Sequence, residues 1–158
     1  MNEITENVSL EMTNVLTYRG KVTQQQMTVI AKEMNDIITA NKANKTISGV
    51  SATYEIINPG VDAVMDVEIM YPLDKHINVS SPYKVKPIFR LRNAVKIRHE
   101  GRPDLLQNSA NKLIQYINEK GLMPITVGYN VTVHEPQSPV EIDSLVVDLY
   151  IGVCDNIL

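Results

Sequence analysis

Apolar and polar residues follow two different periods along this chain, and the periods predict where helices and strands lie. Between Thr23 and about Asn41, apolar residues recur every three or four positions: Met27, Ile30, Ala31, Met34, Ile37 and Ile38. This spacing is typical of an amphipathic helix. Thr23 and Gln26 have the spacing of a capping box, which predicts that the helix begins directly after Thr23.

Two strands are predicted after this helix, over 46–57 and 61–71. In both segments apolar residues alternate with polar ones, as on a strand with one buried face. The faces consist of Val50, Ala52, Tyr54 and Ile56 in the first strand, and of Val61, Ala63, Met65, Val67, Ile69 and Tyr71 in the second. Asn58, Pro59 and Gly60 form a turn signal between them, so we expect an antiparallel hairpin.

The second half of the chain repeats this order. A strand over 91–99 runs into Gly101, as an earlier strand around residues 10–16 runs toward Gly20. A helix is predicted from Pro103 to Gly121, because proline suits the first helical position and glycine ends helices. Alternating segments over 125–135 and 141–153 then flank a proline-containing turn at 136–139.

Equivalent landmarks keep a nearly constant offset, which indicates an internal repeat. Gly20 precedes Gly101 by 81 positions, Gly49 precedes Gly128 by 79, and Glu68 precedes Asp148 by 80. We therefore predict an α+β fold of one domain over 1–158, with repeat one at about 8–73, a linker at 74–87 and repeat two at about 88–153. Two β-α-β-β repeats related by a pseudo-twofold would form a curved antiparallel sheet, with both helices on one face and a central groove on the other.

The candidate ligand-binding residues are those that the strand period places on the groove face. They are Glu68, Met70, Asp148 and Tyr150 from the last strand of each repeat, with Glu55 and Thr132 from the hairpin partners. Lys96 and Arg98 are expected on the same face. An acid beside a large side chain suits a cationic or amphipathic organic ligand. The alternative is a solvated sheet face with no specific role.

Composition narrows the class of protein without naming an activity. The chain has 158 residues, of which 44% are hydrophobic and 21% charged, as is ordinary for one globular domain. A net charge of -3 argues against general nucleic-acid binding. The first residues lack the pattern of a signal peptide and no apolar run is long enough to cross a bilayer, so we expect a cytoplasmic protein without a membrane partner.

Motifs for metal, cofactor or nucleophile chemistry are missing from the sequence, so no metal and no cofactor are expected. The three histidines lack zinc-site spacing, and no phosphate-binding or dinucleotide-binding glycine pattern is present. We expect His99 to be a histidine with satisfied hydrogen bonds at a strand end. Cys154 is expected to be a small apolar residue near the edge of the core.

The strand endings Glu68–Leu73 (EIMYPL) and Asp148–Val153 (DLYIGV) resemble those of the GyrI-like, or bacterial transcription-activator effector-binding, superfamily. Arg98-His99-Glu100-Gly101 resembles the strand-to-helix connection of that superfamily, and the resemblance extends from about residue 10 to residue 153. It implies a curved sheet with a central ligand cleft. It also implies that an acid in the final strand, here Asp148, contacts the ligand; Gly152 stands where the superfamily has proline.

The sequence therefore predicts a stand-alone small-molecule-binding protein whose central cleft holds a cationic or amphipathic ligand. Two alternatives stay open. One is a protein-interaction or inhibitor module, as in the gyrase inhibitor after which the superfamily is named. The other is a hydrolase, in which Glu68 or Asp148 acts as base and Tyr150 as hydrogen-bond donor.

Overall fold

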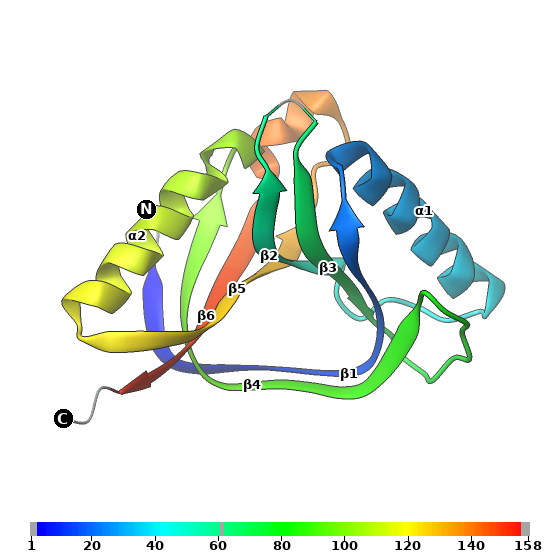
Figure 1. The fold of residues 1–158 in the computed structure, drawn as a ribbon, viewed down its shortest axis with the longest axis horizontal. Helices are drawn as coiled ribbons and strands as arrows, with labels where there is room; N and C mark the ends of the chain where they lie inside the picture. Colours follow the sequence, from blue (N-terminus) through cyan, green and yellow to red (C-terminus); the bar gives the residue numbers. More distant parts are fainter. Residues whose placement is uncertain (1–2, 61, 156–158) are drawn as a thin grey trace. The chain divides into compact units, whose positions relative to one another are not determined.

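The computed structural model describes residues 3–60 and 62–155, and shows an α+β protein with antiparallel strands (Figure 1). Its elements are β1 (Ile4–Val22), α1 (Gln24–Ala40), β2 (Gly49–Asn58), β3 (Val64–Pro72), β4 (Lys84–Glu100), the 3-10 helix η1 (Pro103–Leu105), α2 (Leu106–Glu119), β5 (Leu122–His134), the 3-10 helix η2 (Pro139–Ser144) and β6 (Val146–Asp155). Val61, predicted as the first residue of a strand, lies outside the described residues.

The chain forms two compact units with the same topology. The first unit is Met12–Phe89, and the second unit is Met1–Glu11 together with Arg90–Leu158. In the first unit β3 lies between β1 and β2, and in the second unit β6 lies between β4 and β5; all four pairings are antiparallel. Each unit thus places its last strand in the middle, behind one helix. The duplicated β-α-β-β order predicted from the sequence offsets is confirmed.

Helix α1 begins where the capping box predicts. The backbone N–H of Gln26 donates to the Thr23 hydroxyl at 3.2 Å, and the Thr23 N–H donates to the Gln26 side chain at 2.9 Å. Met34 and Ile38 point from the helix into a buried cluster that includes Leu16 of β1 and residues of β3 and the following segment: Ile69, Tyr71, Leu73 and Ile77. The helix therefore covers the β3 face that carries Ile69 and Tyr71.

Helix α2 has the equivalent position in the second unit. Pro103 opens a single 3-10 turn and the α-helix follows from Leu106, while Gly121 takes a left-handed φ of 70° just after its end. The buried residues of this cluster are Leu113 and Ile117 from the helix and Val95, Ile97, Leu149, Ile151 and Val153 from the strands. On β6, as on β3, one face packs on the helix and the other face does not.

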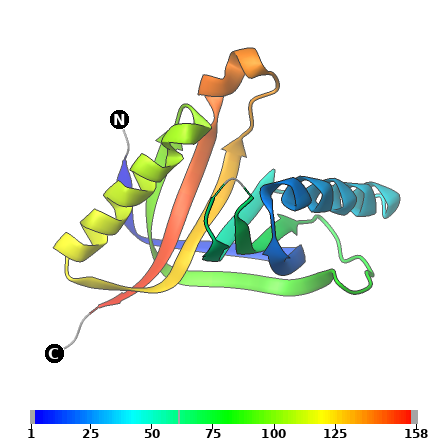
Figure 2. The ribbon, with the colours of Figure 1, turned by 45° about the horizontal axis from the view of Figure 1, so that its top comes forward.

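Among the element boundaries that differ from the prediction, two lie in segments that join the strands. Strand β4 begins at Lys84, inside the segment expected to be a linker at 74–87. Pro87 lies inside β4, because proline is tolerated where a strand does not need its N–H for the ladder. The segment expected to begin the last strand at residue 141 instead forms η2, at the end of the β5–β6 hairpin (Figure 2), and β6 begins at Val146.

Within residues 3–60 and 62–155, neither helix has the length and apolar character needed to cross a bilayer.

Candidate functional site

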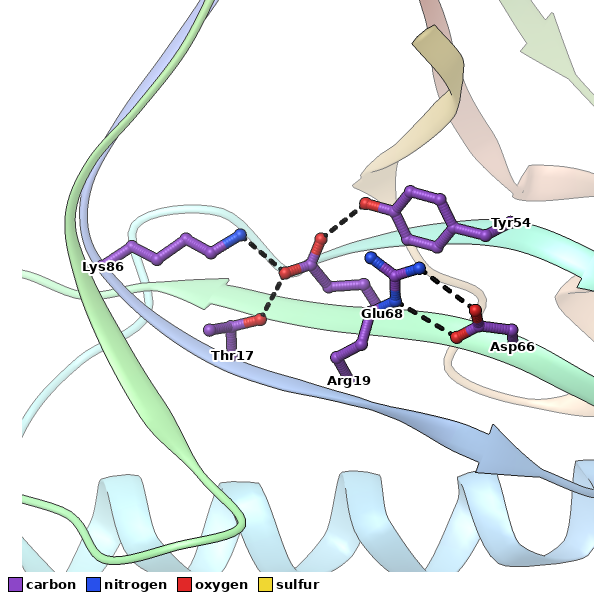
Figure 3. A network of polar contacts seen from close by, with 6 residues as sticks. All are labelled: Thr17, Arg19, Tyr54, Asp66, Glu68 and Lys86. Atoms are coloured by element: carbon purple, nitrogen blue, oxygen red, sulfur yellow. Dashed lines mark hydrogen bonds and ion pairs between the residues drawn. The ribbon is translucent and has the colours of Figure 1, made fainter.

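Glu68 is a buried acid in the middle strand of the first unit. Only 3% of its surface is exposed. Three side chains donate to its carboxylate (Figure 3): Thr17 and Lys86 reach Oε2 at 2.8 and 2.7 Å, and the Tyr54 hydroxyl reaches Oε1 at 2.9 Å. These donors come from β1, β4 and β2 respectively. Together with β3, which carries Glu68, four strands therefore contribute to the site, and all four of these residues belong to the first unit.

The strand register explains how two of the donors reach Glu68. Thr17 is opposite Met70 on β3, one pleat from Glu68 and on the same face. Ala52 of β2 lies directly opposite Glu68 and is small, which leaves space above the carboxylate. Tyr54 follows two residues later at a β-bulge, between the pairs formed by Thr53 and Glu55. From there its hydroxyl extends to the acid.

The donors keep Glu68 ionised despite its burial. Burial raises the pKa of the Glu68 carboxyl, but the hydrogen bonds from Lys86, Thr17 and Tyr54 together lower it by more. The net pKa lies below the usual value of a glutamate. The negative charge is balanced by the Lys86 ammonium, whose side chain is 41% exposed compared with 4% for that of Glu68.

Arg19 holds the tyrosine of the site in place. Its guanidinium binds Asp66 through two hydrogen bonds of 3.1 Å and stacks on the Tyr54 ring, with 3.5 Å between its central carbon and the ring centroid (Figure 3). Arg19 is opposite Glu68 in the register, yet it turns to Asp66 two residues away. The hydrogen bond from Arg19 lowers the pKa of Asp66. Glu68 therefore accepts hydrogen bonds from Lys86 and from the neutral Thr17 and Tyr54, and not from Arg19.

A hollow opens beside this carboxylate. It measures about 260 Å³ and is lined by Thr17, Arg19, Tyr54, Glu68, Pro82, Lys84 and Lys86. Pockets for drug-sized molecules run from roughly 300 to 1,000 Å³, so the hollow fits a small molecule or one group of a larger one. Its wall combines an aromatic ring, hydroxyl groups, one carboxylate and three cationic side chains.

Asp148 occupies the equivalent position on β6, but its contacts differ. Arg98 binds it through two hydrogen bonds of 2.8 and 2.9 Å, and the Lys96 ammonium lies 3.7 Å from Oδ2. The hydrogen bonds to Asp148 raise the pKa of Arg98. Tyr150 is partly buried, and burial, followed by the charge of Asp148, raises the pKa of its hydroxyl. The bulge residue equivalent to Tyr54 is Val133, which has no side-chain donor.

The remaining sequence-predicted residues do not join these acids in the way expected. Met70 is fully buried and Glu55 is exposed, and neither is among the residues that line the described hollow. The prediction that Thr132 shares a face with Asp148 is wrong. Thr132 pairs with Val147, and Val131 pairs with Asp148. Paired residues share a face, so Thr132 lies on the side that α2 covers.

The error has a physical cause that also hid Tyr54. Val50 and Ala52 pair with Met70 and Glu68, so the apolar face of β2 is the face of the acid. The buried residues of β2 and β5 lie on the face that carries the acid in the neighbouring strand, and alternation alone cannot tell this face from the one on the helix side. Lys86 was missed because it lies in the predicted linker. The alternation of Lys84 and Lys86 around Val85 was the available signal that a strand begins there.

His99 has the satisfied contacts that the sequence analysis expects. It is 3% exposed, with Nδ1 2.8 Å from the Ser109 hydroxyl and Nε2 2.9 Å from the carbonyl oxygen of Arg102. Because a carbonyl can only accept, Nε2 carries the proton and Nδ1 accepts from Ser109. In the part of the chain that the structure describes, no group of three His, Cys, Asp or Glu side chains is arranged to hold a metal ion.

Comparison with known proteins identifies the fold. Neither a protein-family model nor a curated protein matches this sequence. The C-terminal domain of EcmrR superposes with a TM-score of 0.72 at 15% identity, over 99% of this chain and 98% of that domain. In the EcmrR–DNA complex the match covers 58% of the EcmrR chain, so this chain spans little more than half the length of that protein.

Two proteins from Listeria innocua are also similar. An uncharacterized conserved protein has a TM-score of 0.66 at 12% identity, over 97% of this chain and 92% of its own. A hydrolase has a TM-score of 0.63 at 11% identity, over 97% of this chain and 91% of its own. At such identities the likeness concerns the fold. The chain therefore has the GyrI-like fold that its strand endings and its internal repeat predict.

Proposed function

We propose that this chain is a small-molecule-binding protein, and that the hollow beside Glu68 holds the cationic group of an organic ligand. The observation that supports this most is a buried, ionised carboxylate in the wall of an open hollow, next to an aromatic ring. Such a carboxylate is costly to bury and attracts a cation more strongly than an exposed one does.

The contacts of Glu68 suit binding because they fix the carboxylate before a ligand arrives. Thr17 and Tyr54 each donate to one oxygen, and Arg19 stacks on the Tyr54 ring. A site whose groups are already oriented loses less side-chain entropy when a ligand binds. The remaining open face of the hollow is then available to the apolar part of an amphipathic ligand.

The same contacts favour binding over hydrolysis as the role of Glu68. A general base works best when its pKa lies near the working pH. The hydrogen bonds from Lys86, Thr17 and Tyr54 lower the pKa of Glu68 and so move it further from neutral pH. Tyr54 also donates a hydrogen bond to Glu68, so its hydroxyl cannot donate to a substrate unless that bond breaks.

Calorimetric titration with benzyltrimethylammonium and with the anion phenylmethanesulfonate tests the proposal. The two probes share a benzyl group and differ in charge. The wild-type chain should bind the cation and not the anion, and Glu68→Gln should weaken cation binding at least tenfold. Glu55→Gln is the matched control, because Glu55 is an exposed acid on β2 that does not line the hollow. Equal cation affinity in wild type and Glu68→Gln would reject the site, and preferential anion binding would reject the ligand class.

A further inference from the structure

Lys86 has an unusual position in the site: it is the cation that already sits on Glu68. Its Nζ lies 2.7 Å from Glu68 Oε2, the shortest of the three contacts to that carboxylate. A cationic ligand that approaches Glu68 therefore meets a site whose charge is satisfied. The ligand must either bind elsewhere in the hollow or replace Lys86.

The two partners of this ion pair differ in their freedom to move. Glu68 lies on the middle strand of the first unit, and 4% of its side chain is exposed. Lys86 lies near the start of β4, and 41% of its side chain is exposed. A lysine carries its charge on a flexible four-carbon stem that can turn toward water. Separation of the pair would thus move Lys86 and leave Glu68 in place.

Glu68 also remains partly satisfied when Lys86 leaves. Thr17 and Tyr54 donate to different oxygens of the carboxylate, and both come from strands that pair directly with β3. The two neutral donors would keep the carboxylate oriented, while the ammonium position at Oε2 becomes vacant for another cation.

Asp148 shows the opposite arrangement in the second unit. Arg98 holds it with two parallel hydrogen bonds, and Lys96 supplies a second positive charge. A bidentate arginine pair is geometrically fixed and is not readily exchanged. Of the two equivalent acids, Glu68 is the one with a single, partly exposed lysine on it.

We propose that Lys86 is a built-in competitor, which occupies the cation position of the Glu68 site until the ligand displaces it. This inference rests on the function proposed above and adds its regulation. Ligand binding is then an exchange of one cation for another, so Lys86 lowers the affinity for every cationic ligand. Neutral and anionic molecules cannot replace the lost ion pair. The lysine therefore acts as a selectivity filter that favours cations over neutral and anionic molecules.

The test compares Lys86→Met with Lys84→Met, because both lysines line the hollow and Lys86 bonds to Glu68. Benzyltrimethylammonium is titrated into each full-length variant by calorimetry at pH 7. Lys86→Met should bind the cation at least tenfold more tightly than wild type, and Lys84→Met should change the affinity less than threefold. Adding Glu68→Gln to Lys86→Met should remove the gain.

Each outcome decides between the two proposals. If wild type and Lys86→Met bind the cation equally, the competitor role falls while the binding site stands. Weaker binding by Lys86→Met likewise overturns it, because Lys86 would then assist the ligand. If neither protein binds the cation, both proposals fall.

A second measurement covers the case in which Lys86→Met does not fold. In the wild-type chain, the NMR signal of the Lys86 ammonium should move to the position of solvent-exposed lysines as the cation saturates the site. A Lys86 signal that stays unchanged at saturation would overturn the inference.

Discussion

Glu68 remains charged in a buried position because each of its oxygens accepts a hydrogen bond, and one oxygen also meets an ammonium. Asp148 instead accepts two hydrogen bonds from the guanidinium of Arg98, one on each carboxylate oxygen. The two acids are equivalent in sequence and in register, but their partners give them different properties. The partner set, more than the acid itself, makes Glu68 the better candidate for ligand binding.

Replacing Tyr54 with phenylalanine should weaken the network without creating a cavity. Glu68 Oε1 loses its donor, so the pKa of Glu68 should rise and the free energy of unfolding should fall by about 1 to 2 kcal/mol. Urea unfolding and an NMR titration of the carboxyl carbon measure the two effects. Tyr83→Phe is a suitable control, because its hydroxyl binds the exposed Glu33 instead. A Glu68 pKa unchanged by Tyr54→Phe would contradict the network.

The lowered pKa of Glu68 also predicts how stability depends on pH. The folded pKa is below the ordinary value of 4.5, so the unfolded chain binds a proton more readily than the folded one. This stabilisation is present above the unfolded pKa and is lost as pH falls through the folded pKa. Urea unfolding between pH 7 and pH 3 should show a smaller decline for Glu68→Gln than for wild type.

Part of that decline should persist in the variant, because Asp66, Asp74 and Asp104 also have lowered pKa values. Identical declines in wild type and Glu68→Gln would show that the pKa of Glu68 is not lowered in the folded chain.

At the scale of helices and strands, local chemistry fixes some boundaries and leaves others open. The spacing of Thr23 and Gln26 predicts the start of α1, and the structure shows both hydrogen bonds of this capping box. The faces of β2 and β5 could not be assigned in the same way. The buried residues of each strand lie on one face only, and the bulges that set its register against the next strand are not visible in the alternation. Sequence alternation therefore found the two acids but missed Tyr54.

Loss of the α1 cap should have a measurable cost. Thr23→Ala removes the side-chain acceptor for the Gln26 N–H and should lower the free energy of unfolding by about 1 kcal/mol. Thr28→Ala is the matched control: its exposed hydroxyl bonds the Gln24 carbonyl inside the same helix, and a change within about 0.5 kcal/mol is expected. Equal losses in urea unfolding would mean that Thr23 acts through something other than the cap.

The connection from β4 to α2 depends on a buried polar contact. Ser109→Ala removes the donor to His99 Nδ1 and leaves a buried ring nitrogen without it, at a cost of about 1 to 3 kcal/mol. Amide hydrogen exchange should show the largest loss of protection around η1 and the first turn of α2. Unchanged protection there would show that the Ser109–His99 contact does not stabilise the connection.

At the scale of the whole chain, the internal repeat was visible in the sequence because length changes between the halves are small. Glycine positions and the two acids kept their offsets, and the two units share one topology. The difference between the contacts of Glu68 and those of Asp148 was not visible in the same way. At equivalent bulges, the first unit has Tyr54 and the second has Val133. The charged partner of the acid is a lysine in the first unit and a bidentate arginine in the second.

The crystal structure of the chain with benzyltrimethylammonium tests the central claim most directly. The account predicts density for one cation per chain in the hollow, with its charged nitrogen near the Glu68 carboxylate and the Lys86 ammonium turned away. Density for the cation at another place, with the hollow empty and the 2.7 Å Lys86–Glu68 contact intact, would contradict it.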